Sequence, residues 1–496
     1  MEQLYYRSTR GAGENVNAAE AILRGIASDG GLFVPSVIPK LTTNLNELVS
    51  LDYRSLAYRI MSPYLPDYTE KELKEAISSA YDKKFDDENI APLVKHANVW
   101  FLELYHGPTL AFKDMALSIL PHLLKIAASK TGNNKEIIIL TATSGDTGKA
   151  ALEGFADVPG TKIIVFFPED GVSQVQKRQM VTQPGENTYV IGIQGNFDDA
   201  QNGVKKMFAD KELAQRMAAK NFMFSSANSI NIGRMIPQVV YYFFAYLQLC
   251  VRGEAKVGEV VDFAIPTGNF GDILAGYYAK KMGLPIGKLI CASNQNKVLY
   301  DFFLSGVYDK NREFYLSMSP SMDILISSNL ERLLDQVSGD EHSLIRDLML
   351  LLSTTGKYEI TLQMKARLSD FIAGYASEEE TVAAIKEVYE VSRYLIDPHT
   401  AVAFAAWRKY SKADINKTKT VVVSTASPYK FPRDVMKSLD ESYATVGEFD
   451  LAEKMSILTG HPIPGAVKDL NKKPVLHKTV CAKNAMQGEL EKILGL

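Results

Sequence analysis

The sequence contains little cysteine and little histidine. Its 496 residues include three cysteines, Cys250, Cys291 and Cys481, and seven histidines. The cysteines are too far apart for a disulfide framework or a short metal-binding motif, and no HExxH pattern occurs. These absences argue against an iron–sulfur cluster, a cysteine-based zinc site and a secreted disulfide scaffold. We therefore expect no bound metal and a reduced, cytoplasmic compartment.

The sequence also lacks an excess of one charge and a long apolar run. The net charge is −3 and the pI is near 6.2, so we expect no nucleic-acid partner. The most apolar stretch, residues 239–249, is too short to cross a bilayer, and we predict a buried helix there rather than a membrane contact. The first residues have no apolar segment typical of a signal peptide.

The chain does contain a repeated order of apolar strand, polar turn and helix. Continuous apolar runs rich in β-branched residues predict strands buried on both faces. These strands are expected at residues 136–140, 162–167, 188–193, 260–265, 288–292 and 420–424, with helices at 149–155, 199–209 and 273–282. The order is typical of an α/β fold with mainly parallel sheets, in which ligands bind beyond the carboxyl ends of the strands.

Other regions depart from this order and indicate further domains. A chain of this length is expected to form two or three of them. Residues 1–95 predict a small, mostly helical N-terminal domain, followed by a catalytic region over 96–496. Residues 305–395 predict an inserted helical region, whose acidic run at 377–380 we interpret as a solvated face.

One lysine, Lys113, has unusual neighbours. It follows the turn at residues 107–109 and three apolar residues, 110–112, and an apolar stripe at helical spacing comes after it. Burial lowers the pKa of a lysine and leaves a neutral amine that can attack a carbonyl. On this residue alone the alternative is an ordinary surface lysine.

Polar turns at the predicted strand ends supply further candidates. Gly268-Asn269-Phe270-Gly271-Asp272 opens a helix, and such a helix N-terminus with glycines can bind a phosphate. The turn at residues 143–149 offers hydroxyls and N–H groups for a carboxylate. It is not a nucleotide P-loop, because Thr143 and Ala150 replace the required Gly and Ser or Thr.

Two more turns and two histidines complete the candidates. A hydroxyl at residues 424–431 can pair with a ring nitrogen, and Arg234 is the residue type that commonly binds phosphate. Each of these turns has an ordinary structural interpretation that explains it equally well or better on its own. For His106 and His399 we expect a structural role.

Taken together and in order, these residues resemble the threonine synthase family, whose members are fold-type II pyridoxal-phosphate enzymes. The resemblance extends over nearly the whole chain. It rests on Ser8-Thr9-Arg10-Gly11, Asp29-Gly30-Gly31-Leu32-Phe33-Val34-Pro35, His106-Gly107-Pro108-Thr109, Phe112-Lys113-Asp114, Ser144-Gly145-Asp146-Thr147-Gly148, Asn228-Ser229-Ile230-Asn231, Arg234, Gly268-Asn269-Phe270-Gly271-Asp272, Ser319-Pro320-Ser321-Met322-Asp323 and Asp397-Pro398-His399-Thr400-Ala401-Val402.

The resemblance implies pyridoxal 5′-phosphate as cofactor and a role for each matching residue. Lys113 would form the Schiff base and act as the catalytic base. The other cofactor-binding residues would be Gly268, Asn269, Phe270, Gly271 and Asp272 for the phosphate, Thr425 for the pyridine nitrogen, and Asp146. The substrate-binding residues would be Ser144 and Thr147 for the α-carboxylate, with Thr109, Ser229, Asn231 and Arg234 around the rest of the substrate, including its phosphate.

The resemblance also implies an architecture like that of the tryptophan synthase β chain. It comprises a smaller α/β domain over about 115–230 and a larger one made of 96–114 with 231–496. The insertion at 305–395 resembles the larger fungal and bacterial branch of the family. Members of this branch are often monomers, so we expect a monomer, with a dimer as the alternative.

The implied reaction converts O-phospho-L-homoserine and water to L-threonine and phosphate by γ-elimination and β-addition. The alternatives are a related phospho-lyase that releases 2-oxobutyrate, another fold-type II enzyme such as a dehydratase or cysteine synthase, and a non-catalytic protein of the same fold. Two residues depart from the family pattern. Ser427 stands where many relatives have His, and Asp146 stands where fold-type II enzymes often have Asn.

Overall fold

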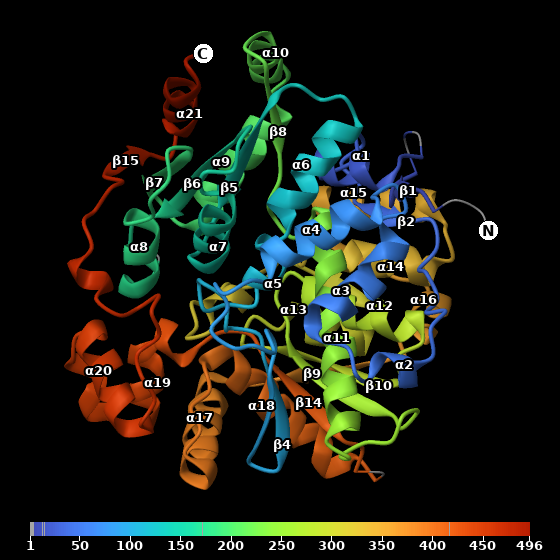
Figure 1. Cartoon of the computed structure of the whole chain (residues 1–496), viewed down its shortest axis with the longest axis vertical. Helices are drawn as coiled ribbons and strands as arrows, with labels where there is room; N and C mark the ends of the chain where they lie inside the picture. Colours follow the sequence, from blue (N-terminus) through green and yellow to red (C-terminus); the bar gives the residue numbers. More distant parts are fainter. Residues whose placement is uncertain (1–3, 12, 14, 171, 416) are drawn as a thin grey trace.

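Two β-sheets covered by helices form the centre of the molecule (Figure 1). The structure, a computed structural model, describes residues 4–11, 13, 15–170, 172–415 and 417–496. In that part of the chain the larger sheet has six strands. Their order is β13 (Phe371–Tyr375), β10 (Ile286–Ser293), β9 (Val261–Pro266), β14 (Thr420–Ser424), β4 (Val99–Glu103) and β3 (Leu93–His96).

The smaller sheet has five strands in the described residues. Their order is β15 (Thr479–Ala482), β7 (Thr188–Gln194), β6 (Thr161–Pro168), β5 (Glu136–Ala142) and β8 (Phe222–Ser225). Neighbouring strands in both sheets run parallel, with the exception of the antiparallel pair β3 and β4. The predicted α/β fold with two mainly parallel sheets is confirmed.

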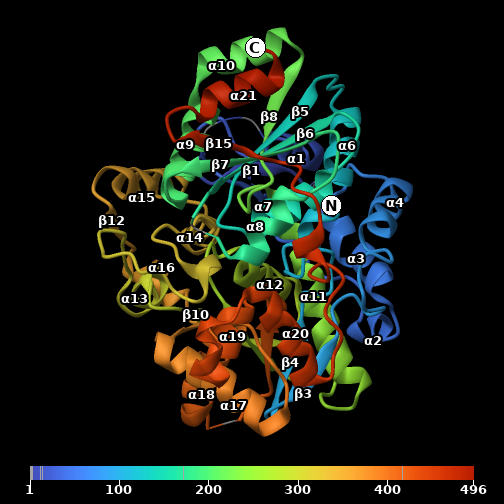
Figure 2. The same cartoon turned by 90° about the vertical axis from the view of Figure 1, so that its left-hand side faces the viewer.

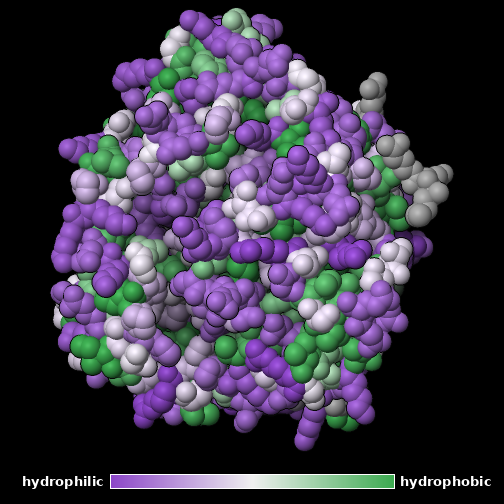
Figure 3. All heavy atoms as spheres, in the orientation of Figure 1, coloured by the Kyte–Doolittle hydropathy of each residue, from purple (hydrophilic) through white to green (hydrophobic). Residues whose placement is uncertain are grey.

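The strands form because their side chains are apolar on both faces. Ile139 of β5, Phe263 of β9 and Val421 of β14 are all fully buried. Burying a side chain of this size stabilises the fold by about 1.5–3 kcal/mol. On the face shown in Figure 3 hydrophilic residues predominate, and hydrophobic residues form small separate groups.

The predicted helices between the strands are present as α7 (Asp146–Phe155), α9 (Phe197–Ala209) and α12 (Gly271–Met282). The apolar stretch lies in α11 (Ile232–Val251), which is buried along most of its length, as predicted. Within the described residues no helix combines the length and the apolar composition that crossing a bilayer requires.

The regular structure of the N-terminal segment is mainly helical, with α1 (Ala18–Arg24), α3 (Tyr53–Met61) and α4 (Glu70–Ala80), but much of the segment is irregular. It also contains an antiparallel pair, β1 (Tyr6–Ser8) with β2 (Phe33–Pro35). Strand β3 lies across the expected boundary at residue 95 and pairs with β4 of the larger sheet. The domain boundaries themselves stay a prediction.

The region 305–395 is less helical than expected. It contains the helices α14 (Leu330–Ser338), α15 (His342–Thr354) and α17 (Glu378–Ser392), but β13 adds a parallel strand to the larger sheet. The acidic run forms the first turn of α17, where Ser377 and Glu380 make a capping box.

The C-terminal segment returns to the smaller sheet. After α19 (Pro432–Leu439) and α20 (Glu448–Thr459), strand β15 pairs in parallel with β7, and α21 (Met486–Leu494) lies beside α9. Figures 1 and 2 show this end of the chain at the opposite end of the molecule from α17 and α18 (Pro398–Ala413). The expected assignment of residues 231–496 to the larger domain alone therefore differs from the structure.

Candidate active site

A cavity of about 260 Å³ lies at the carboxyl ends of strands from both sheets. Its walls come from the residues that follow β5, β8, β9 and β14, together with Lys113. This is where the parallel-sheet pattern predicts a ligand to bind. Most of the candidate site residues meet there although they are far apart in the sequence.

Lys113 lies immediately before the short helix α5 (Asp114–Leu117) and is 9% exposed. Its Nζ is 3.4 Å from Oδ2 of Asp146 and 3.3 Å from Oγ of Ser321. Burial lowers the pKa of Lys113, Asp146 opposes this change, and the cations of Lys430 and Arg234 add to it. The direction agrees with the sequence-based prediction of an amine that is readily neutral.

The five residues 268–272 all line the cavity, and Gly271 begins α12. Phe270 has a φ of 63°, so the chain turns sharply before the helix. A Cβ on Gly268 would lie 2.5 Å from the backbone oxygen of Ser321, so this position needs glycine. The first N–H groups of α12 and its positive dipole end suit a bound phosphate.

The Asp272 carboxyl group lies beneath this loop. Its Oδ1 accepts hydrogen bonds from the hydroxyls of Tyr241 and Tyr242 at 2.6 and 2.7 Å, and its Oδ2 has no hydrogen-bond partner among the described residues. Burial raises the pKa of Asp272 to about 6. The two tyrosines stabilise the ionised form, so the group can be buried close to an anion-binding loop.

The turn between β5 and α7 brings Ser144 and Thr147 into the cavity wall. Oγ1 of Thr143 accepts hydrogen bonds from the N–H groups of Gly145 and Gly148, both at 2.9 Å, and fixes the turn. Lys149 points elsewhere, because its Nζ pairs with Glu153 at 2.8 Å. The turn therefore offers hydroxyls without a lysine, which fits a carboxylate better than a nucleotide.

Thr425 follows β14, lines the cavity and is 6% exposed. Its backbone oxygen accepts a hydrogen bond of 2.8 Å from the N–H of Phe112, so it is joined to the residue before Lys113. Ser427 instead caps the short helix η3 (Pro428–Lys430) by accepting a hydrogen bond from the N–H of Tyr429.

Arg234 lies in the first turn of α11, lines the cavity and is 3% exposed. Its Nε has no hydrogen-bond partner, and no carboxylate of the described residues lies within ion-pair distance of it. Burial lowers the pKa of Arg234 to about 10, so the side chain stays a cation at neutral pH. Together with Ser229, also in the wall, it offers a place for an anion.

The structure does not bring every predicted site residue into the wall of the cavity. Thr109 is fully buried, and its N–H and Oγ1 both bond to the carboxylate of Asp114, at 2.8 and 2.6 Å. Asn231 is fully buried as the cap of α11, and its Nδ2 donates to backbone oxygens of Ile22 and Ser226. The polar groups of both residues are occupied within the protein, so their predicted substrate contacts are not supported.

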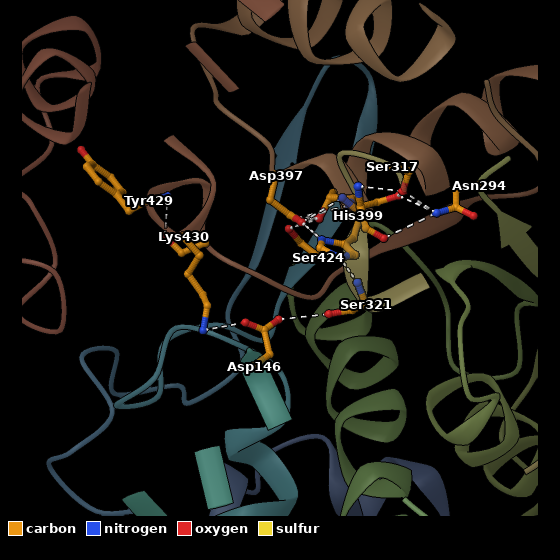
Figure 4. Close-up of polar contacts among 12 residues, drawn as sticks. Asp146, Asn294, Ser317, Ser321, Asp397, His399, Ser424, Tyr429 and Lys430 are labelled. Atoms are coloured by element: carbon orange, nitrogen blue, oxygen red, sulfur yellow. Dashed lines mark hydrogen bonds and ion pairs between the residues drawn. The ribbon is translucent and has the colours of Figure 1, made fainter. Parts of the chain in front are cut away.

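Two residues for which no catalytic or binding role was predicted lie at the site. Ser321 donates from Oγ to Oδ2 of Asp146 at 3.2 Å, and His399 lines the cavity beside it (Figure 4). Both belong to motifs that carried the family resemblance, which was the available signal. His399 is hydrogen-bonded at both ring nitrogens, to Asp397 and to the N–H of Ser321, in keeping with the structural role expected for it.

A buried lysine, an anion-binding loop at a helix N-terminus and a strand-end hydroxyl line one cavity between two mainly parallel sheets. This combination defines a pyridoxal-phosphate-dependent enzyme of fold type II, and the family "Pyridoxal-phosphate dependent enzyme" matches residues 86–426. The families "Threonine synthase N terminus" and "Threonine synthase, C-terminal" match residues 5–81 and 400–483. The chain belongs to the threonine synthase family.

Similar proteins of known identity agree with this assignment. The threonine synthase of Pseudomonas aeruginosa is 41% identical over 87% of this chain and 90% of its own length. Human threonine synthase-like 1 is 41% identical over 85% of this chain. The matched region covers 58% of the length of the human protein. The crystal structure of pyridoxal-phosphate-bound threonine synthase from Brucella melitensis superposes with a TM-score of 0.87, at 36% identity and 99% coverage of both chains.

Proposed function

We propose that this protein converts O-phospho-L-homoserine and water to L-threonine and inorganic phosphate with the help of pyridoxal phosphate. The observation that carries the proposal is the buried amine of Lys113 in one cavity with the 268–272 loop and Arg234. One ligand anion can bind at the loop and a second at the arginine. That arrangement fits a phosphorylated cofactor and a phosphorylated substrate.

The residues present fit pyridoxal phosphate. Lys113 would hold its aldehyde carbon, residues 268–272 its phosphate, and the hydroxyl of Thr425 its ring nitrogen. A hydroxyl leaves that nitrogen largely unprotonated, in contrast to a carboxylate. When bound, the cofactor supplies an electron sink beside the substrate Cα.

Lys113 is the group that moves protons. The Lys113 amine would take the proton from Cα of the substrate and later one from Cβ, because burial lowers the pKa of Lys113 and so favours its neutral, basic form. Asp146 and Ser321 hold its Nζ in place through the contacts at 3.4 and 3.3 Å. The hydroxyls of Ser144 and Thr147 would orient the substrate carboxylate.

The phosphate group must leave from Cγ, and charge accumulates on its oxygens as the C–O bond breaks. Arg234 presents a buried cation with an unused Nε–H to stabilise that charge. A proton is then added at Cγ, water adds at Cβ and a proton returns to Cα, so the atoms of substrate and water are all recovered in threonine and phosphate.

Product analysis tests this proposal. Purified protein with pyridoxal phosphate and O-phospho-L-homoserine should release threonine and phosphate in equal amounts. Release of 2-oxobutyrate would favour the phospho-lyase alternative, which stays relevant because the human relative carries the name threonine synthase-like. Lys113→Ala should abolish both turnover and the covalent cofactor absorbance, whereas Lys177→Ala, at a half-buried lysine outside the cavity, should keep both.

We also infer a monomer in a reducing, cytoplasmic compartment. Cys250, Cys291 and Cys481 are all free thiols, which supports the compartment. Size-exclusion chromatography with light scattering would show one chain per particle at micromolar concentration, and a stable dimer would contradict the inference.

A further inference from the structure

A second lysine, Lys430, contacts the same carboxylate, Asp146, as the active-site lysine does. It ends helix η3 and is fully buried. Its Nζ is 2.8 Å from Oδ1 of Asp146 and donates a hydrogen bond of 2.8 Å to the backbone oxygen of Thr109 (Figure 4). Burying an ammonium group without partners raises the free energy of the folded state, so the fully buried Lys430 needs both of these partners.

The two oxygens of Asp146 face opposite sides. Oδ1 accepts from Lys430 and from Nε2 of Gln176, the latter at 2.9 Å, whereas Oδ2 contacts Lys113 and Ser321. The carboxylate therefore lies between two lysines that come from different parts of the chain. The shorter of the two ion pairs is the one with Lys430, not the one with Lys113.

Lys430 also holds the turn that carries Lys113. The oxygen of Thr109 accepts from Lys430, and the N–H and Oγ1 of Thr109 donate to Asp114, the residue after Lys113. Lys430 thus joins Asp146, at the start of α7, to Thr109, and Thr109 in turn binds Asp114 at the other end of the 109–114 turn. Moving Lys430 would move Lys113 and its acceptor relative to each other.

We propose that Lys430 is a positioning residue for Lys113. It fixes the Asp146 carboxylate against the Lys113 amine and pairs with that carboxylate through the oxygen that Lys113 does not contact. This inference rests on the proposed function only for its consequence in catalysis. The contacts on which it depends belong to the protein alone.

The need for this second cation follows from what Lys113 does. During proton transfer the Lys113 amine changes between charged and neutral, and a carboxylate paired with Lys113 alone would be unpaired whenever that amine is neutral. An unpaired buried carboxylate would take up a proton. With Lys430 beside it, Asp146 keeps its charge in both states, so its influence on Lys113 stays constant.

The electrostatics of the cluster agree with this geometry. Burial raises the pKa of Asp146, but Lys430 first and Lys113 second hold it well below its usual range. The charged groups that face Lys113 are Asp146, Lys430 and Arg234. Removing Lys430 should therefore raise the pKa of Lys113, because one repelling cation is lost and Asp146 is left to pair with Lys113 alone.

The test uses Lys430→Met, which keeps an unbranched side chain one atom shorter and removes its charge. It also uses the double variant Lys430→Met with Asp146→Asn, which removes the buried charge pair. The pKa of Lys113 is measured in cofactor-free protein from the pH dependence of its acetylation by acetic anhydride, followed by mass spectrometry. Lys149→Met, at a buried lysine of α7 paired with Glu153, is the matched control.

We expect Lys430→Met to raise the pKa of Lys113 by at least one unit, equivalent to a tenfold change in its proton affinity, and to lower kcat at neutral pH by at least tenfold. The double variant should return the Lys113 pKa towards its original value, and Lys149→Met should leave it unchanged. An unchanged Lys113 pKa in folded Lys430→Met would overturn the proposal.

Circular dichroism of each variant covers the case in which Lys430→Met does not fold. If the double variant folds where the single one does not, the cause is the Asp146 charge that Lys430 no longer balances, and the proposal stands. If neither folds, Lys430 acts through packing and the proposal fails. A different reaction product from the unmodified enzyme would refute the proposed function without affecting the Lys113 titration.

Discussion

The backbone N–H of Ser321 donates a hydrogen bond of 3.1 Å to Nε2 of His399, a residue that follows it by 78 positions in the chain. Nδ1 of His399 is 2.7 Å from Oδ1 of Asp397, which makes Nδ1 the protonated nitrogen and Nε2 the acceptor. Ser321 in turn contacts Lys113 and Asp146. The histidine therefore anchors the loop that borders both the reactive amine and the phosphate loop.

Replacing His399 with Leu should weaken this anchor. The N–H of Ser321 would lose its acceptor, which costs about 1–3 kcal/mol where water cannot replace it. We expect a lower free energy of unfolding and a weaker affinity for pyridoxal phosphate, measured by urea unfolding and by cofactor titration. His399→Gln keeps an acceptor and should lose less of both, and equal losses in the two variants would contradict the assigned role.

Gly268→Ala should damage the phosphate loop. The added Cβ would lie 2.5 Å from the backbone oxygen of Ser321, and a clash of this kind typically costs about 1–3 kcal/mol. Because the loop has to move away, we expect the dissociation constant for pyridoxal phosphate to rise at least tenfold. Gly465→Ala, where no atom lies within 4 Å of the added Cβ, is the control and should bind the cofactor normally.

Arg234→Gln should weaken binding of the substrate phosphate. Hydrogen bonds to charged groups contribute about 1.5–3 kcal/mol, so KM for O-phospho-L-homoserine should rise at least tenfold. Inhibition by inorganic phosphate should weaken in parallel. Arg252→Gln, at the exposed end of α11, should change neither quantity. An unchanged KM in folded Arg234→Gln would show that another group binds this phosphate.

Asp272→Asn should change how stability depends on pH. Burial raises the pKa of Asp272 from its ordinary value of 3.8 to about 6, so the folded protein holds this proton more tightly than the unfolded chain does. The stabilisation is complete below pH 3.8 and is lost as the pH rises to about 6. Relative to the variant, the unmodified protein should lose up to about 3 kcal/mol across this window.

Urea unfolding of cofactor-free protein at several pH values between 4 and 7 measures this difference. Asp434→Asn is the matched control, because burial also raises the pKa of Asp434 to about 6 and Asp434 lies outside the cavity wall. It should show a similar pH effect with an unchanged affinity for pyridoxal phosphate. Parallel stability curves for Asp272→Asn and the unmodified protein would contradict the prediction.

The strands that the sequence predicts are those with long apolar runs. β5, β6, β7, β9, β10 and β14 are buried on both faces, and their composition alone marks them as central strands. Most of the unpredicted strands are short or at a sheet edge, and the exception is β4, which is buried throughout and lies inside the larger sheet. β15 has one buried residue in four, so its sequence carries almost no hydrophobic pattern, and its pairing with β7 depends on contacts distant in the chain.

Site residues whose surroundings depend on contacts distant in the chain are also hard to predict from the sequence. Lys113 is recognisable because apolar residues surround it in the sequence itself. Lys430 is not, because its burial depends on Asp146 and Thr109, which lie far from it in the chain. Conversely, Thr109 belongs to a motif of the family, but its bonds to Asp114 show that it shapes the turn before Lys113.

The late return of the chain to the smaller sheet has a consequence for synthesis on the ribosome. β5, β6, β7 and β8 emerge first, but the outer edge of β7 has no partner until β15 follows. At roughly 5–20 residues per second, that edge stays open for on the order of tens of seconds. An open strand edge can pair with other chains, so the nascent protein passes through a period in which it depends on chaperones or on transient cover from its own helices.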